Sequence, residues 1–194
     1  MSAQGQRKFG IFLALTGAMM VLFGWLLWPD EDAHVLSWTP EIRLAASEAG
    51  IDPALLAGLV YAESRGQADA VSSVGAMGLC QLMPPTAGEL AGQMDISGPP
   101  YSAQDNLRMG ATYLAKMHRR WDGDLDLAIL SYRLGPTRVR RQMEAAGGQE
   151  AYFAELQGKS PTPWAYRDQI LAARLRYSEH FAMSVDVPPS TSQD

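Results

Sequence analysis

The chain has 194 residues, of which 47% are apolar and 19% are charged, and its formal net charge at pH 7 is −5. This length leaves room for one domain of ordinary size. The single cysteine excludes an internal disulfide, and the acidic balance after Trp38 argues against a nucleic-acid-binding surface, which normally needs a basic face.

The first predicted element is a membrane-spanning helix at residues 9–28. This stretch has no charged side chain, and its length at about 1.5 Å per residue matches the ~30 Å hydrocarbon core of a bilayer. Basic residues precede it and acidic residues at 30–32 follow it, so the positive-inside rule places residues 1–8 in the cytoplasm and the rest of the chain across the membrane. A cleaved secretory signal is the alternative, but no small-x-small cleavage site follows, so we expect an uncleaved single-pass anchor.

One face of this helix carries small residues. They are Gly10, Ala14, Gly17 and Gly24, at steps of four, three and seven. Small side chains permit close packing of helices in a bilayer, which favours self-association or pairing with another membrane protein. A chance stripe is the alternative, because Gly and Ala are common in spanning helices.

The rest of the chain divides into a linker, one domain and a tail. We expect the linker at 29–38, the domain at 39–184 and a disordered tail at 185–194. No segment of useful length alternates at period two, so the domain is predicted to be all-α. Capping residues, prolines and glycines place its helices at 39–50, 52–65, 75–82, 86–91, 103–120, 124–134, 137–146, 150–157 and 163–182.

The helix at 52–65 carries a carboxylate on its apolar face. Asp52 can cap it, Pro53 suits its first position and Gly66 can end it. Its buried stripe is Leu55, Leu56, Leu59 and Val60. Glu63 continues that stripe in the last turn, where desolvation and the helix dipole both raise the pKa of a carboxyl group. Such a group can act as a general acid, whereas the alternative is a helix-end Glu that bends out to solvent.

Several motifs follow Glu63 in a fixed order. They are Glu63-Ser64, then Ser72, then Gly-Ala-Met-Gly-Leu-Cys-Gln-Leu-Met-Pro at 75–84, Asp-Asn with Gly110 and Tyr-Leu at 105–114, and Ser-Tyr-Arg-Leu-Gly-Pro at 131–136. In order and spacing, over about residues 40 to 140, they resemble the lytic transglycosylases of the soluble type, the SLT domain family. Several ordered motifs are far more specific than one.

The resemblance implies a lysozyme-like fold in which a helix-end Glu faces a sugar-binding cleft. Lytic transglycosylases cleave the β-1,4 bond between N-acetylmuramic acid and N-acetylglucosamine with one Glu, no water and no cofactor, and leave a 1,6-anhydromuramoyl end. By resemblance, Glu63 is the acid and then the base, and Tyr132 reaches its carboxyl group. The substrate-binding residues implied are Ser64, Ser72, Gln81, Met83, Ser131 and Arg133. With the predicted anchor in the inner membrane, the domain would meet peptidoglycan strands in the periplasm.

The chain departs from the family pattern at three places. Arg133 stands where the family has Asn, Cys80 stands where it usually has Met, and residues 164–170 lack the Glu-Thr and Tyr of its Glu-Thr-x-x-Tyr-Val element. The back wall of the cleft is therefore expected to differ. Two other classes stay open: a hydrolytic lysozyme of related fold, and a catalytically weak glycan-binding scaffold.

Metal and thiol chemistry are not indicated. The three histidines are dispersed, so Cys80 has no recognisable base and no zinc-binding pattern forms. Residues 122–126 resemble the start of a calcium loop, but Leu127 occupies the position that needs Gly. We interpret Asp124 as a helix cap.

The densest basic patch is Arg133, Arg138, Arg140 and Arg141. A solvated helix face is the default interpretation. The functional alternative is that these arginines meet carboxylates of peptidoglycan stem peptides, because the guanidinium fork suits a carboxylate.

Overall fold

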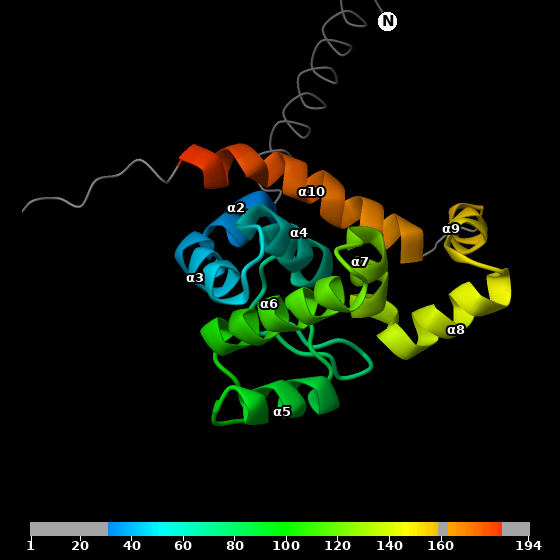
Figure 1. The fold of residues 1–194 in the computed structure, drawn as a ribbon. Helices are drawn as coiled ribbons and strands as arrows, with labels where there is room; N and C mark the ends of the chain where they lie inside the picture. Colours follow the sequence, from blue (N-terminus) through cyan, green and yellow to red (C-terminus); the bar gives the residue numbers. More distant parts are fainter. Residues whose placement is uncertain (1–30, 159–162, 184–194) are drawn as a thin grey trace, which may run out of the picture. The chain divides into compact units, whose positions relative to one another are not determined.

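The computed structural model describes residues 31–158 and 163–183. Over these residues the chain forms helices and no strand, which confirms the predicted all-α class for this part of the chain. The helices are α2 (Glu31–Leu36), α3 (Thr39–Ala49), α4 (Pro53–Ser64), α5 (Pro84–Gln93), α6 (Ala103–Arg120), α7 (Leu125–Leu134), α8 (Pro136–Ala146), α9 (Gln149–Gln157) and α10 (Pro163–Met183) (Figure 1).

The predicted membrane segment at 9–28 and the predicted tail at 185–194 lie outside the described residues. Among the helices that are described, none has the combination of length and apolarity needed to cross a bilayer.

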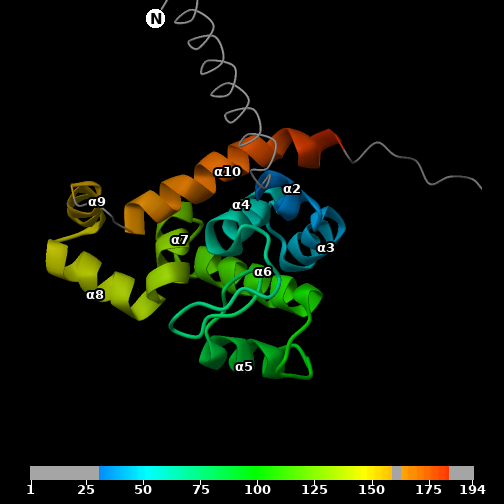
Figure 2. The same ribbon diagram turned by 180° about the vertical axis from the view of Figure 1, so that it is seen from behind.

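The packing of α4 against α10 organises the domain (Figures 1 and 2). Gly58, in the middle of α4, faces the backbone of α10, and a Cβ atom there would lie 2.6 Å from the carbonyl oxygen of Ile170. A glycine inside a helix costs about 1 kcal/mol relative to alanine. Here it permits an approach that no side chain would allow.

The ends of α4 follow the sequence signals closely. The Asp52 side chain accepts a hydrogen bond from the Ala54 N–H at 2.9 Å, and Pro53 opens the helix, as predicted. The helix ends one residue earlier than predicted, because Arg65 adopts the left-handed conformation with φ 55° before Gly66 does so.

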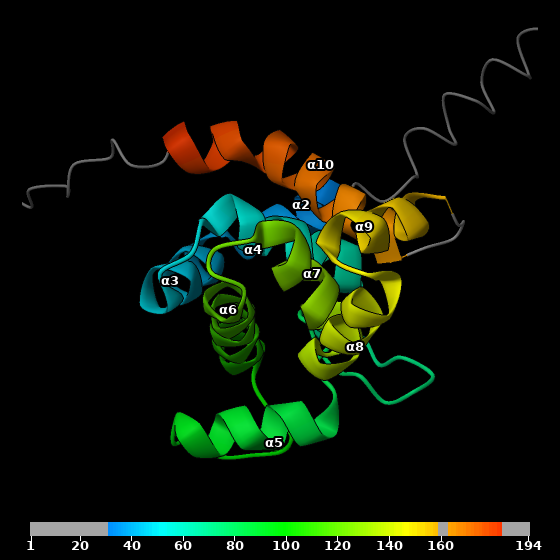
Figure 3. The same cartoon turned by 45° about the vertical axis from the view of Figure 1, so that its right-hand side comes forward.

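The other helices surround this pair. α6 packs against α3, α5 and α7, and one apolar core joins α3, α4, α6 and α10. A second, smaller core lies among α7, α8 and α9, which stand beside one another at the side of the domain away from α3 (Figure 3). Its buried members are Leu127, Leu130, Val139 and Tyr152.

Two predicted segments are wrong. The linker at 29–38 contains helix α2, because Val35 is fully buried in the main core and folds the segment onto the domain. Residues 75–82 are not a helix but a turn-rich loop in which Met77 forms single bridges with Val71 and Leu82. Positive φ angles at Gly75, Gly78 and Gln81 are incompatible with a right-handed helix.

Most other boundaries agree with the prediction. α6 spans the predicted residues 103–120, and Asp124 caps α7 by accepting from the Leu127 N–H at 2.9 Å. α5 is longer than the predicted turn or two, since Pro84 and Pro85 begin it rather than precede it.

Candidate active site

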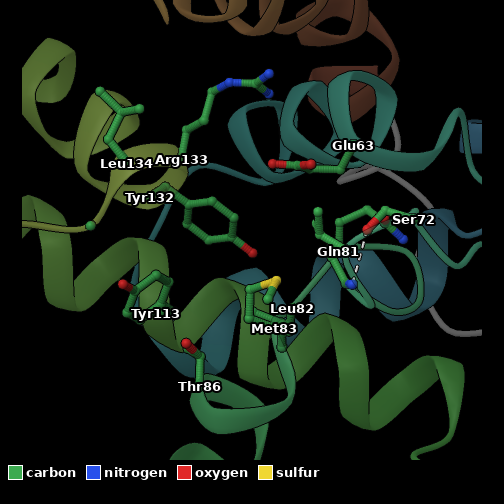
Figure 4. A pocket seen from close by; sticks show the side chains of 13 residues that line it. Glu63, Ser72, Gln81, Leu82, Met83, Thr86, Tyr113, Tyr132, Arg133 and Leu134 are labelled. Atoms are coloured by element: carbon green, nitrogen blue, oxygen red, sulfur yellow. Dashed lines mark hydrogen bonds between the residues drawn. The ribbon is translucent and has the colours of Figure 1, made fainter.

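Glu63 lies in the last turn of α4 and points into a cleft (Figure 4). The cleft has a volume of about 550 Å³ and is lined by residues from α4, from the loop that precedes α5, and from α5, α6 and α7. They are Glu63, Ser72, Val74, Ala76, Gln81, Leu82, Met83, Thr86, Tyr113, Tyr132, Arg133, Leu134 and Gly135. Among these lining residues, Glu63 is the only carboxylic acid.

The surroundings of Glu63 favour its protonated form. Burial raises the pKa of this carboxyl group above its ordinary value, as predicted from its place on the apolar face. A hydrogen bond from Tyr166 and the positive charge of Arg133 act in the opposite direction on the same pKa. Burial is the largest of the three effects, so the pKa of Glu63 lies above its ordinary value.

Tyr166, in the first turns of α10, is the direct partner of Glu63. Its hydroxyl donates to Oε1 of Glu63, and the Arg133 guanidinium lies over its ring with Cζ 4.6 Å from the ring centroid. An ion pair between Arg167 and Asp126, with Nε and Oδ1 2.7 Å apart, ties this part of α10 to α7. Sequence reasoning missed Tyr166, although Gly58 in mid-helix signalled a close neighbour of α4.

The structure gives the Tyr132 hydroxyl a different hydrogen-bond partner from the Glu63 carboxyl group that the resemblance implied. The Tyr132 hydroxyl donates instead to the carbonyl oxygen of Cys80 at 2.9 Å, and its ring stands edge-on to Tyr113 with centroids 5.2 Å apart. The hydroxyl is aimed at the loop, because the turn at 78–81 brings that carbonyl group to the cleft side of α7. Tyr132 therefore supports the wall of the cleft rather than the carboxyl group.

The loop at 72–83 is fastened to α6 by a single buried amide. Asn106 accepts from the Cys80 N–H at 2.8 Å and donates to the Met77 carbonyl oxygen at 3.0 Å. Two glycines make this contact close, since a Cβ atom on Gly78 would lie 2.6 Å from Asn106 and one on Gly110 would lie 2.4 Å from the Cys80 sulfur. Asn106 and Gly110, the Asn and Gly of the α6 motif, therefore hold the loop against α6.

Two predicted sugar-binding residues occupy the floor of this loop. Gln81 donates its Nε2 to the carbonyl oxygens of Ala70 and Gly78, at 3.0 and 2.9 Å, which fixes the amide beside the cleft. The Ser72 oxygen accepts from the Ala76 N–H at 2.9 Å. The Gln81 amide oxygen and the Ser72 hydroxyl hydrogen are left to bond a ligand.

The structure brings six of the eight predicted site residues to the cleft and places two elsewhere. Met83 and Arg133 line it together with Glu63, Tyr132, Ser72 and Gln81. Ser64 is buried and donates to the Leu79 carbonyl oxygen at 2.9 Å. Ser131 has no exposed surface and accepts from the Trp121 indole N–H at 2.7 Å.

Metal-ligating side chains do not converge in the described part of the chain. No group of three or more His, Cys, Asp or Glu side chains there could hold an ion.

Comparison with known proteins identifies a family that this chain matches. Residues 41–153 match the family model of the transglycosylase SLT domain. The chain is 39% identical over 104 residues to a transglycosylase of Enterobacteria phage PRD1, covering 54% of this chain and 37% of that protein. It is 31% identical over 149 residues to membrane-bound lytic murein transglycosylase F of Desulfosudis oleivorans, covering 74% of this chain and 30% of that protein.

A solved structure shares the fold. An inactive mutant of lytic transglycosylase Slt from Pseudomonas aeruginosa superimposes with a TM-score of 0.63 at 27% sequence identity, covering 74% of this chain and 24% of that one. The chain thus spans about a third of the length of the two curated relatives.

Proposed function

This chain belongs to the transglycosylase SLT domain family, and from that premise we propose that it is a peptidoglycan lytic transglycosylase. Its substrate would be the β-1,4 bond between N-acetylmuramic acid and N-acetylglucosamine, and its product a 1,6-anhydromuramoyl end. One observation carries the proposal: a single carboxylic acid, Glu63, lines the cleft. Hydrolytic glycosidases normally need two carboxyl groups about 5 to 10 Å apart, so a lone one favours a reaction without water.

The first step is protonation of the leaving group. Glu63 gives its proton to the glycosidic oxygen as the bond from that oxygen to C1 of the muramoyl sugar breaks and its electron pair moves to the oxygen. Because Tyr166 donates to Oε1, the second carboxyl oxygen is the one left to carry the proton. Burial of Glu63 supports this role, since it raises the pKa of the carboxyl group and so favours the protonated acid.

The second step closes the sugar on itself. The muramoyl C6 hydroxyl attacks C1, and its proton passes to the Glu63 carboxylate, which restores the acid. No water enters and no atom is left on the enzyme. The positive charge of Arg133 and the Tyr166 hydroxyl stabilise Glu63 while it is ionised.

The walls of the cleft would hold the muramoyl sugar. Gln81 and Ser72 offer an acceptor and a donor from one side, and Met83, 41% exposed, offers an apolar contact beside them. We assign these three residues to substrate binding.

The product of the purified full chain tests this function. Mass analysis of muropeptides released from isolated cell walls is expected to give ends lighter by one water than those made by a hydrolytic lysozyme. Hydrolysed ends would overturn the lytic mechanism. Binding of glycan without any cleavage, unchanged in Glu63→Gln, would favour the scaffold alternative.

We also propose that residues 9–28 anchor the enzyme in the inner membrane with its domain in the periplasm. The apolar length of the segment and the charges on either side support this, and one curated relative is named as membrane-bound. A periplasmic reporter fused after residue 194 should be active, and alkaline extraction should leave the chain in the membrane. An inactive reporter or a chain released by alkali would contradict the anchor.

Pairing through the small-residue face of that segment remains a prediction. An in-membrane association assay on residues 1–36 should give a signal above a non-pairing control helix, and Gly17→Ile with Gly24→Ile should abolish it. A wild-type signal equal to the control would make the segment a tether only.

A further inference from the structure

The segment that the sequence predicted as a linker packs against the helix that carries Glu63. Residues 31–38 comprise α2 and the two residues after it, and α2 lies beside α4 (Figures 1 and 2). Val35 is fully buried in the main core, and Trp38 is half-buried against the same core. The match to the family model begins at residue 41, so this segment precedes the matched residues.

The contact between this segment and α4 falls just after Glu63. Gly66, two residues beyond the end of α4, has φ 79°, and a Cβ atom there would lie 2.7 Å from backbone atoms of His34 and Val35. The Trp38 indole N–H donates to the Gly66 carbonyl oxygen at 3.0 Å. The backbone of α2 therefore contacts the turn that ends α4, three residues after Glu63.

Ser64 fastens the same turn to the loop at 72–83. Its hydroxyl donates to the Leu79 carbonyl oxygen at 2.9 Å and accepts from the Gly66 N–H at 3.2 Å. The last turn of a helix frays readily, because its carbonyl groups lack intrahelical partners. Here the turn is held at Gly66, whose N–H bonds to Ser64 and whose carbonyl oxygen bonds to Trp38.

α2 is itself tied to α10, the helix that brings Tyr166 to Glu63. The Tyr177 hydroxyl donates to Oδ1 of Asp32 at 2.6 Å, and Nη1 of Arg176 lies 3.5 Å from Oδ2 of Asp32. The segment at 31–38 thus links the end of α4 to the helix that carries the hydrogen-bond partner of the Glu63 carboxyl group.

We propose that Trp38 is a positioning residue for Glu63, which it holds in place through Gly66 and the end of α4. Trp38 does not line the cleft, so it acts on the reaction only through α4. Proton transfer requires Glu63 to lie within hydrogen-bond distance of the glycosidic oxygen, and a displacement of about 1 Å lowers the rate by about 100-fold. The inference rests on the proposed function, because it takes Glu63 to be the acid.

Trp38→Phe tests this, since it keeps an aromatic ring and the backbone that begins α3 but removes the donor to Gly66. Cleavage of soluble glycan strands by the full-length chain is measured at a temperature at which every variant is folded. We expect kcat to fall by about 10-fold and KM to change by less than about 2-fold, because the lining of the cleft is intact.

Val139→Ala is the control for lost stability. Val139 is fully buried in the small core of α7, α8 and α9 and does not line the cleft. This variant should lower the midpoint of urea unfolding at least as much as Trp38→Phe does, and it should leave kcat unchanged.

Gly66→Ala and Gly50→Ala form a matched pair. Both glycines have positive φ, at 79° and 69°, so alanine strains the backbone similarly at each. A Cβ atom on Gly50 meets nothing within 4 Å, whereas one on Gly66 displaces the backbone of α2. We expect Gly66→Ala to lower kcat by about 100-fold and Gly50→Ala to leave it unchanged. If Gly66→Ala does not fold, Trp38→Phe decides by itself.

Three results would each overturn the positioning role. They are an unchanged kcat in Trp38→Phe, a loss of kcat in Val139→Ala equal to that in Trp38→Phe, and a raised KM in Trp38→Phe with kcat retained.

The reaction product separates this inference from the proposed function. If the wild type releases anhydromuramoyl ends and kcat does not depend on Trp38, the proposed function stands alone. If the wild type releases hydrolysed ends and kcat still falls in Trp38→Phe, the lytic mechanism fails and the positioning role remains, since Glu63 is the acid in either reaction.

Discussion

Two walls of the same cleft are built in different ways. One wall, the loop at 72–83, is held to α6 by backbone hydrogen bonds to Asn106 and by the absence of side chains at Gly78 and Gly110. The other wall, the helical wall, is made by the side chains of Tyr132 and Arg133 on α7. Arg133 of this wall and Tyr166 of α10, which does not line the cleft, both act on the charge of Glu63.

This difference means that the shape of the cleft and the protonation of Glu63 depend on different residues. A change in the loop wall should alter the position of bound sugar and the stability of the domain, but not the pH at which the enzyme works. A change at Arg133 or Tyr166, the two residues that act on the charge of Glu63, should move the pH profile and leave the stability nearly unchanged. Glu63 lies between the two walls and depends on both.

The largest effect is expected from Glu63→Gln, which keeps the shape of the side chain but removes the proton. Glycan cleavage should fall by about 1000-fold or more, because one group supplies both the acid and the base. Turnover of cell-wall glycan, measured beside the exposed control Glu144→Gln, checks this. Substantial activity in a well-folded mutant would reject Glu63 as the catalytic acid.

The same mutant should be more stable than the wild type at high pH. The pKa of Glu63 in the folded chain lies above its ordinary value of 4.5, so its contribution to stability is full below pH 4.5 and is lost as pH rises through the folded pKa. Urea unfolding at pH 8 should therefore favour Glu63→Gln, and the difference should vanish toward pH 4. If the wild type were more stable than Glu63→Gln at pH 8, burial would not be the main influence on the pKa of Glu63.

Asn106→Ala should break the loop wall. It leaves the Cys80 N–H without a partner and removes one of the two hydrogen bonds to the Met77 carbonyl oxygen, which keeps the one from the Leu82 N–H. The expected cost is about 1 to 3 kcal/mol of unfolding free energy. Displacement of the loop by about 1 Å should lower kcat/KM by about 100-fold. Asn106→Asp keeps the acceptor for the Cys80 N–H, so its stability and its kcat/KM should fall between those of the wild type and of Asn106→Ala. Neither mutant should change the pH profile, and a shifted profile would contradict a loop wall that sets only the shape of the cleft.

Tyr166→Phe should have the reverse pattern of Asn106→Ala: the pH profile should move and the stability should hardly change. Turnover should fall by about 10-fold through loss of one oriented donor, with little change in stability. Because that hydrogen bond lowers the pKa of Glu63, its loss raises the pKa, and the alkaline limb of the rate profile should move to higher pH. A pH–rate series with Tyr101→Phe as control measures this, and an unmoved limb would leave Tyr166 as packing only.

Tyr132→Phe should have the smallest effect. Its hydroxyl donates to the Cys80 carbonyl group, so its loss should cost about 1 kcal/mol of stability and lower turnover by about 3-fold, without moving the pH profile. A shift of the alkaline limb as large as that in Tyr166→Phe would instead support the direct contact between Tyr132 and Glu63 that the resemblance implied.

The sequence by itself determined the features that local chemistry encodes. Asp52, Pro53 and Asp124 mark helix starts because their effects act within one turn, and the ordered motifs identified the family. The position of Glu63 on an apolar stripe predicted the raised pKa, because burial of that face follows from helical periodicity alone.

The tertiary structure decided what depends on distant segments. Tyr166 is 103 residues from Glu63 and reaches it only because Gly58 lets α10 approach the backbone of α4. The loop at 75–82 looked helical because it is apolar, but its turn at 78–81, with left-handed residues at Gly78 and Gln81, is held against Asn106 of α6. The partner of Tyr132 likewise follows from how segments far apart in sequence pack, which no local pattern encodes.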